Sequence, residues 1–163
     1  MVQKILIFRI FFFLIFFFQS SLVYAKNIEG KARVIDGDTI YIGETKIRLH
    51  GIDAPEKNQK CFFHNKDWEC GKRSTLYLKK IISNHNVMCE TRNKDSYKRY
   101  IGICYINDEN INKLIVRNGW AIAYKYYSKD FIKDELIAKK NKLGIWKGSF
   151  QEPYLFRKKI KIK

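Results

Sequence analysis

Hydrophobic and polar side chains alternate along residues 31–49, and turn sequences separate the apolar pairs. The alternation is interrupted at Asp36-Gly37 and at Gly43-Glu44. The apolar pairs are Ala32 and Val34, Ile40 and Ile42, and Ile47 and Leu49. A period of two that is broken by turn residues is typical of strands with one buried face. This segment therefore predicts three antiparallel strands joined by tight turns.

Two further apolar segments, residues 87–90 and 100–106, predict a fourth and a fifth strand joined through residues 94–97. Between the third and the fourth strand, residues 57–67 are polar and predict a loop, and about residues 69–83 predict a helix. The side chains of this helix that we expect to be buried are Leu78, Ile81 and Ile82.

Two more helices are predicted after the fifth strand. The first covers about residues 111–118, with Asn110 as its N-cap and Gly119 as its C-terminal stop. The last begins near Ser128 and ends before Gly144. Its expected inward side chains are Phe131, Ile132, Leu136 and Leu143. The order of elements predicts an α+β, mainly β fold: a five-stranded OB-type barrel with about three helices packed on its outside.

The N-terminal segment has the organisation of an export signal. Lys4 and Arg9 precede an unbroken apolar run over residues 10–18, and small residues follow up to Ala25. The run is shorter than the roughly 20 residues of a spanning helix, so we expect a signal peptide over residues 1–25 that is cleaved after Ala25. The alternative is an uncleaved leader that tethers the protein to a membrane. Cleavage predicts a secreted or periplasmic protein.

Removal of the leader leaves 138 residues, which suits one domain over residues 26–163. Its core is expected over about residues 30–150, and the basic residues 157–163 form a C-terminal tail that we expect to be solvated and mobile. The whole chain has a net charge of +16, of which the leader contributes +2, so the domain carries +14. Such an excess favours a polyanionic partner. Charge alone leaves nucleic acid, anionic lipid and cell-wall polymer as alternatives.

Four cysteines in an exported chain favour disulfides, with structural zinc as the alternative. No Cys-x-x-Cys pair or finger-like spacing of Cys and His supports zinc. The midpoint between Cys89 and Cys104 falls between Ser96 and Tyr97, where the composition already places the hairpin turn. These two cysteines should therefore lie opposite each other and be bonded. By elimination, Cys61 pairs with Cys70.

Charged residues cluster at the predicted strand ends, namely Asp38, Arg48, Asp53, Glu56 and Arg99. Taken singly, each has an ordinary explanation as a turn, a solvated strand face or a helix start. Together they suit phosphoryl chemistry, because hard cations bind several oxygens and the scissile phosphate needs cationic groups beside it. The turn at Gly43 folds Asp38 and Asp53 back toward one end of the hairpin.

The order of these residues resembles the staphylococcal nuclease, or thermonuclease, family over about residues 30–150. The segments that carry the resemblance are residues 34–39 (VIDGDT), 47–56 (IRLHGIDAPE), 95–99 (DSYKR) and 143–146 (LGIW). The family has an OB barrel with three helices, in agreement with the pattern above. The resemblance implies a nuclease that uses Ca2+ to hydrolyse DNA and RNA and leaves 3'-phosphate ends, acting on its own as a monomer.

The resemblance also implies roles for individual residues. Asp38 and Asp53 would bind calcium through their side chains, and Ala54 would bind it through its backbone carbonyl. Glu56 would act as general base toward the attacking water. Arg48 and Arg99 would bind the phosphate and stabilise the five-coordinate transition state.

The late turn departs from many relatives, which have Lys and Gly where this chain has Ser96 and Lys98. We expect Lys98 to constrain the turn and to affect the aim of Arg99, or else to move a phosphate-binding charge along the chain. Tyr124 and Tyr126 match positions that line the family's nucleotide pocket, as does Tyr97 within the late-turn motif. For Tyr124 and Tyr126, packing of a strand end against the last helix is an equal alternative.

Three functions compete at this point. The first is a nuclease with little sequence preference, because backbone contacts carry no sequence information. The second is a non-catalytic barrel of the same family that only binds nucleic acid, and retention of all five charged residues argues against it. The third is a basic surface protein that binds envelope polymers through residues 157–163.

Overall fold

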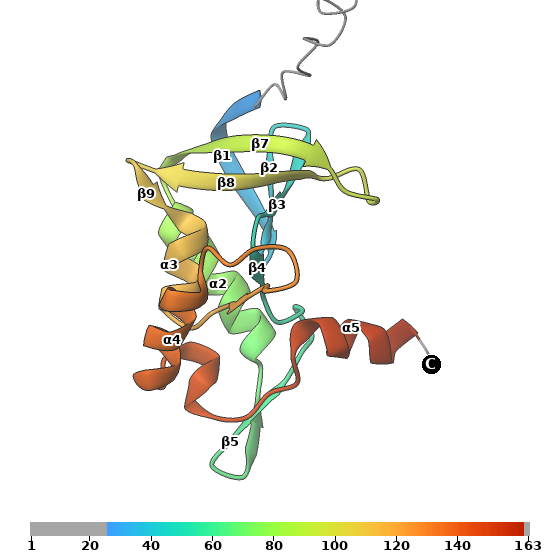
Figure 1. The fold of residues 1–163 in the computed structure, drawn as a ribbon, viewed down its shortest axis with the longest axis vertical. Coiled ribbons are helices and arrows are strands. Elements are labelled where there is room, and N and C mark those ends of the chain that lie inside the picture. The colour runs from blue at the N-terminus through green and yellow to red at the C-terminus, as the bar shows by residue number, and fades with distance from the viewer. Residues whose placement is uncertain (1–25, 162–163) are drawn as a thin grey trace, which may run out of the picture.

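Residues 26–161 are described by the computed structural model, and a closed β-barrel forms one end of this part of the chain (Figure 1). The predicted signal peptide lies outside the described residues. Five strands form the barrel, in the order β3-β2-β1-β7-β8. Their bounds are β1 Lys26–Asp36, β2 Thr39–Ile42, β3 Thr45–Leu49, β7 Asn86–Lys94 and β8 Tyr100–Ile106. The predicted five-stranded barrel is therefore confirmed.

Strand pairing follows the alternation in the sequence. Strand β2 is antiparallel to β1 and β3, with Ile40 opposite Val34 on one side and Ile47 on the other. Strands β7 and β8 form the predicted hairpin, in which Cys89 lies directly opposite Cys104. A parallel pairing of β3 with β8 closes the barrel, which makes the sheet mixed.

The closure is held by a buried polar side chain, Asn112. Its amide nitrogen donates to the carbonyl oxygens of His50 at 2.9 Å and Gly102 at 3.2 Å, and its oxygen accepts from the Cys104 amide at 3.1 Å. Asn112 is completely buried. Because buried backbone groups without partners are costly, this one side chain satisfies the irregular backbone where β3 ends beside β8.

Two helices cover one end of the barrel: α2, Cys70–Ile82, and α3, Ile111–Arg117. Helix α2 buries Leu78 and Ile82 and leaves Ile81 partly covered, close to the prediction. Helix α3 begins as predicted. The Asn110 side chain accepts from the Lys113 amide at 2.9 Å and caps the first turn.

Helix α4, Ile132–Lys140, differs from the prediction in its start and in its buried face. It begins four residues after Ser128, and Leu136 and Leu143, predicted to face inward, are 57% and 37% exposed. Phe131 is buried as predicted, and Ile132 is partly buried against the core. The other inward side chains are Asp134, Glu135 and Ala138. Acids can occupy this face because Asp134 pairs with Arg117, and Glu135 with Lys125 and Lys139.

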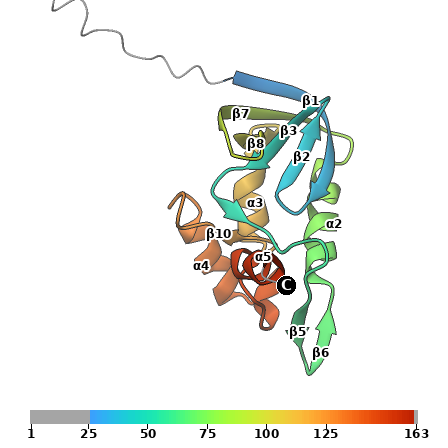
Figure 2. The ribbon, with the colours of Figure 1, turned by 90° about the vertical axis from the view of Figure 1, so that its right-hand side faces the viewer.

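Short strands complete the description. Strand β4, Ile52–Asp53, pairs with β10, Ile122–Ala123, and β9, Glu109–Asn110, extends the sheet beside β8. The segment predicted as a loop contains a small hairpin of β5, Cys61–Phe63, and β6, Lys66–Trp68. Figure 2 shows this hairpin at the end of the molecule opposite the barrel.

The C-terminal part was predicted least well. After the 3-10 helix η1, Gly144–Lys147, the chain forms a further helix, α5, Pro153–Lys161. Residues 157–161, part of the segment predicted to be a solvated tail, belong to α5, in which Lys158, Lys159 and Ile160 are exposed and Arg157 is partly buried. In Figure 1, α5 projects sideways from the rest of the fold. Among residues 26–161, no helix is long and apolar enough to cross a membrane.

Two disulfides are present, Cys61–Cys70 and Cys89–Cys104, in the pairing that the sequence predicts. The first joins the β5–β6 hairpin to the start of α2, and the second joins β7 to β8. Disulfides indicate that the protein folds in an oxidising, extracytoplasmic compartment.

Replacement of Cys89 and Cys104 by Ala should lower the free energy of unfolding by about 3 kcal/mol, because the cross-link closes a loop with a sequence separation of 15. Urea denaturation followed by circular dichroism measures the change. A non-reducing peptide map of the parent protein is the control. Finding Cys89 joined to Cys61 or Cys70 would contradict the hairpin register.

Candidate functional site

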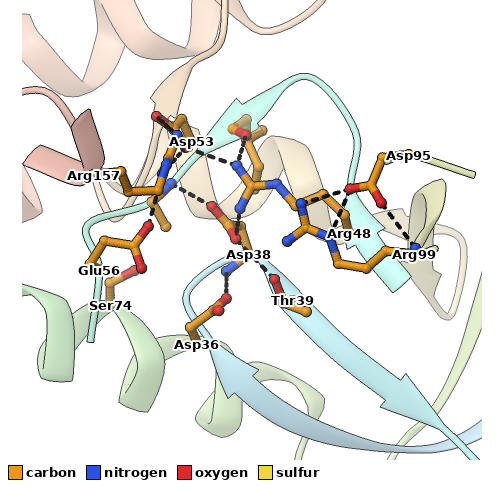
Figure 3. Close-up of polar contacts among 12 residues, drawn as sticks. Asp36, Asp38, Thr39, Arg48, Asp53, Glu56, Ser74, Asp95, Arg99 and Arg157 are labelled. Atoms are coloured by element: carbon orange, nitrogen blue, oxygen red, sulfur yellow. Dashed lines mark hydrogen bonds and ion pairs between the residues drawn. The ribbon is translucent and has the colours of Figure 1, made fainter. Parts of the chain in front are cut away.

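The charged residues singled out in the sequence meet at one end of the barrel (Figure 3). Asp38 lies in the turn between β1 and β2, Arg48 lies on β3, and Asp53 ends β4. The register of β2 and β3 places Thr39 opposite Arg48, which brings Asp38 beside the guanidinium. Pairing of Asp53 with Ile122 on β10 fixes the other carboxylate.

Arg48 bridges the two aspartates. Its Nη1 donates to Asp38 Oδ1, and its Nη2 donates to Asp53 Oδ1 at 2.8 Å. Asp38 is 2% exposed and Asp53 is fully buried, so both charges depend on these partners. Burial lowers the pKa of Arg48, the Asp53 carboxylate opposes that shift, and the charges of Arg99 and Arg157 add to it. The guanidinium nevertheless stays protonated, as arginine does in proteins.

Backbone groups hold the carboxylates in position. The Ala54 amide donates to Asp38 Oδ2 at 2.8 Å, and Asp36 Oδ1 accepts from the Asp38 amide at 3.1 Å. The turn packs closely on α2, because a Cβ on Gly37 would lie 2.2 Å from Ser74 Oγ. A Cβ on Gly71 would lie 1.7 Å from the Glu56 carbonyl oxygen. These two glycines let the segment that carries the site lie directly against α2.

Glu56 reaches the cluster through a residue that the sequence analysis did not single out, Arg157 on α5. Arg157 Nη1 lies 2.9 Å from both Asp53 Oδ1 and Glu56 Oε1, and its Nη2 lies 3.1 Å from Asp53 Oδ2. Burial alone would lower the pKa of Arg157, but the hydrogen bonds and charges of Asp53, and then of Glu56, raise it overall. Pro153 followed by a basic amphipathic segment is a helix-start signal that could have indicated α5.

Arg99 comes from the turn between β7 and β8 and lies beside Arg48 (Figure 3). Asp95 holds it: the carboxylate accepts from Arg99 Nε at 2.8 Å and from the Arg99 and Tyr97 amides at 3.0 and 2.9 Å. Burial would raise the pKa of Asp95, but these hydrogen bonds lower it overall. Lys98 has a φ of 61°, the left-handed conformation that favours glycine, yet the turn keeps its backbone hydrogen bonds.

The three tyrosines differ in their surroundings. Tyr97 is 66% exposed, and the Arg99 guanidinium lies over its ring, with 5.3 Å between Arg99 Cζ and the ring centre. Tyr124 is partly buried, and both this burial and the nearby Asp53 charge raise its pKa. Tyr126 is 84% exposed, so packing against the last helix does not account for it. A role in nucleotide binding stays a prediction for all three.

The donor set suits a hard divalent cation in its chemistry, since Asp38 and Asp53 are buried carboxylates held by one guanidinium. Within residues 26–161, however, no three His, Cys, Asp or Glu side chains lie close enough together to hold an ion. Arg157 occupies the space between Asp53 and Glu56 and is itself a cation. Asp38 and Asp53 are therefore the residues of this cluster whose chemistry suits a hard cation, and calcium binding by them and by the Ala54 carbonyl stays a prediction.

Comparison with known proteins agrees with this geometry. The model of the staphylococcal nuclease homologue family matches residues 46–148, a range that contains Arg48, Asp53, Glu56 and Arg99 and ends before α5. An uncharacterized endonuclease of Haemophilus influenzae is 32% identical over 157 residues, covering 91% of this chain and 83% of that protein. The micrococcal nuclease of Shigella flexneri is 30% identical over 147 residues, which cover 79% of each chain.

A third relative is not named as a nuclease. The succinoglycan biosynthesis protein ExoI of Rhizobium meliloti is 35% identical over 128 residues, covering 76% of this chain and 67% of that protein.

Asp95→Asn should lower the free energy of unfolding by about 1.5 kcal/mol at pH 7, the low end for hydrogen bonds to a charged group, because both partners are partly exposed. The lowered pKa of Asp95 sets the sign of the pH dependence. Its contribution is complete above the unfolded pKa of about 3.9 and is lost as the pH falls through the folded value. Urea denaturation at pH 7 and pH 3 measures both effects.

Asp108→Asn is the matched control, because Asp108 is an exposed acid in another tight turn. It should leave stability nearly unchanged at both pH values. An Asp95→Asn deficit that persisted undiminished at pH 3 would contradict the electrostatic origin.

Proposed function

Because the chain belongs to the staphylococcal nuclease family, we propose that it is an exported, calcium-dependent nuclease that cleaves DNA and RNA and leaves 3'-phosphate ends. The coarser statement follows from the family and from relatives named as nucleases: the protein is a nuclease, and nucleic acid is its substrate. The observation that carries the finer proposal is the convergence of Asp38, Arg48 and Asp53 at one end of the barrel.

Calcium, when bound, would neutralise charge that develops on the phosphate oxygens and orient the attacking water. The groups that would hold it are the carboxylates of Asp38 and Asp53 and the carbonyl of Ala54. Oxygen ligands of this kind favour calcium over zinc, which binds more readily to His and Cys.

Glu56 would be the proton acceptor in the hydrolytic step. Its carboxylate would accept a proton from water as the water oxygen attacks phosphorus. The bond from phosphorus to the 5'-oxygen would break, and the departing 5'-oxygen would take a proton from solvent. The side chain of Glu56 is 31% exposed, so solvent and substrate can reach it. This bond cleavage leaves the phosphate on the 3' side.

Arg48 and Arg99 would stabilise the five-coordinate transition state by donating to its equatorial oxygens. Arg48 is held rigidly by two buried carboxylates, and Arg99 is held by Asp95. Donors that are already oriented need no reorganisation when charge develops, which is the condition for effective electrostatic catalysis.

Substrate binding would combine charge and stacking. The domain's charge of +14 attracts the phosphate backbone without regard to sequence. Tyr97 lies against Arg99 and Tyr124 lies near Asp53. These two tyrosines and the exposed Tyr126 would stack on bases or line the nucleotide pocket. This arrangement supports action on both DNA and RNA with little sequence preference.

Export is supported by the two disulfides and by the composition of residues 1–25. A protein cleaved after Ala25 would act in the periplasm or outside the cell. Calcium is available to hard-ligand sites in extracellular modules at millimolar levels, which suits a site of moderate affinity.

Chelation should abolish cleavage of DNA and RNA by purified residues 26–163, and added calcium should restore it. The physical reason is that a negatively charged, phosphorane-like transition state beside two anionic carboxylates needs a cation to offset its charge. Calorimetric titration of the Asp53→Asn variant provides a readout independent of activity, and calcium affinity should fall by about tenfold or more. Activity that survives chelation, or that appears with zinc alone, would contradict the assigned metal site.

Glu56→Gln and Arg99→Ala should each lower kcat by about a hundred- to a thousand-fold while changing KM little. Both groups act on charge that develops in the transition state, whereas the basic surface supplies most of the ground-state attraction. Stopped-time digestion of a labelled oligonucleotide measures both constants.

Glu44→Gln and Arg92→Ala are matched controls, because both side chains are exposed and lie outside the cluster. They should cleave at nearly the parental rate. If Glu56→Gln also cleaved at that rate, the chain would keep the family's residues without its mechanism, and the binding-only alternative would gain support.

A further inference from the structure

The docking of α5 depends on Arg157. Its guanidinium makes a two-pronged contact with Asp53 and shares one nitrogen with Glu56, at 2.9 to 3.1 Å. Such paired, charge-assisted hydrogen bonds are among the strongest polar contacts in proteins. Figure 3 shows Arg157 on the opposite side of Asp53 from Arg48.

The rest of α5 is attached loosely. Tyr154, Leu155, Lys158 and Ile160 are exposed. Apart from Arg157, the side chains of α5 that are described as covered are Pro153, which is buried, and Phe156, which is partly buried. Just before the helix, the carbonyl of Gln151 accepts from Gln59 Nε2 at 2.7 Å. A helix of nine residues is marginal in water by itself. Without the Arg157 contacts, α5 therefore has little to keep it docked and folded.

The proposed function gives the carboxylates of Asp53 and Glu56 other roles. Asp53 would bind the cation through its side chain, and Glu56 would face the attacking water. Arg157 engages both oxygens of Asp53 and one oxygen of Glu56. A guanidinium and a divalent cation on the same carboxylate also repel each other, since both are positive.

We propose that Arg157 is an internal cation that competes with the divalent metal for Asp53 and Glu56, so that α5 is a latch released by metal binding. This inference rests on the proposed calcium site and adds a form of regulation to it. Linkage makes the effect reciprocal: calcium weakens the docking of α5 by the same factor as docking weakens the binding of calcium. Loss of Arg157 should therefore strengthen the binding of calcium.

The competition separates two roles that Arg157 could have. A residue that only positions Asp53 and Glu56 for the metal would help calcium bind, so its removal would weaken binding. A competing cation has the opposite effect. The sign of the change in calcium affinity therefore distinguishes them.

Isothermal titration of calcium into the parent protein and into Arg157→Gln tests the sign. The dissociation constant should fall by about tenfold in Arg157→Gln, within the usual range of coupling between sites. Lys158→Gln is the matched control, because it removes one positive charge from the exposed side of the same helix and should leave the constant unchanged. Loss of the heat of calcium binding in the Asp53→Asn variant shows that this heat comes from binding at the Asp53 site.

The outcomes separate this inference from the proposed function. Calcium binding that is equal or weaker in Arg157→Gln, with normal binding by the parent, overturns the latch and leaves the calcium site standing. No binding in any variant overturns both. Equal strengthening in Arg157→Gln and Lys158→Gln would show a general charge effect and would also overturn the latch.

Hydrogen exchange gives a second readout that does not involve catalysis. Backbone amides of residues 153–161 should exchange faster in the parent when calcium is added, because α5 loses its anchor and unfolds locally. In Arg157→Gln they should exchange fast without calcium. Exchange in the parent that is unaffected by saturating calcium would overturn the inference.

Discussion

The pairing of one arginine with two buried aspartates is the constraint on which the rest of the site depends. Arg48 is the shared partner of Asp38 and Asp53, and both carboxylates are almost completely removed from water. Loss of one member of such a group leaves an uncompensated buried charge, which typically costs about 3 to 5 kcal/mol. The three residues therefore form one unit, in which a change in any member alters the other two.

The strands of the barrel bring the three residues of this unit together. Asp38 and Arg48 belong to neighbouring strands of one hairpin, whereas Asp53 is held by β10, which comes about seventy residues later in the chain. The parallel contact of β3 with β8 brings the turn that carries Arg99 to the same end. Segments from four parts of the chain thus meet at the cluster, and the fold is what makes their side chains neighbours.

Much of this could be predicted because it follows from local rules. Alternation predicted the first three strands, and the midpoint of Cys89 and Cys104 placed the β7–β8 hairpin. Asn110 was identified as a cap because its side chain acts on a backbone group only three residues away. The family's motif supplied the site residues, and the structure brings them to one end of the barrel.

The inward face of α4 and the contact of Arg157 could not be predicted, because they depend on residues that are distant in the sequence. The inward face of α4 carries Asp134 and Glu135, whose charges are acceptable only because Arg117 and Lys125 lie opposite in the folded chain. Arg157 finds Asp53 across a sequence separation of 104, beyond the reach of any periodicity. The sequence predicted a charged tail for this segment because lysines follow Arg157 closely.

The order in which the chain can assemble follows from the positions of its cross-links. Both disulfides join residues that are near in sequence, with separations of 9 and 15, whereas the β3–β8 contact pairs Ile47 with Tyr100. Closing a long loop costs more entropy before it gains any contact, so the β7–β8 hairpin and the short loop between Cys61 and Cys70 can form and oxidise while the barrel is still open. An emerging chain would therefore carry its covalent bonds before the charged cluster is assembled, and native cysteine pairing would precede the arrival of Arg99 beside Arg48.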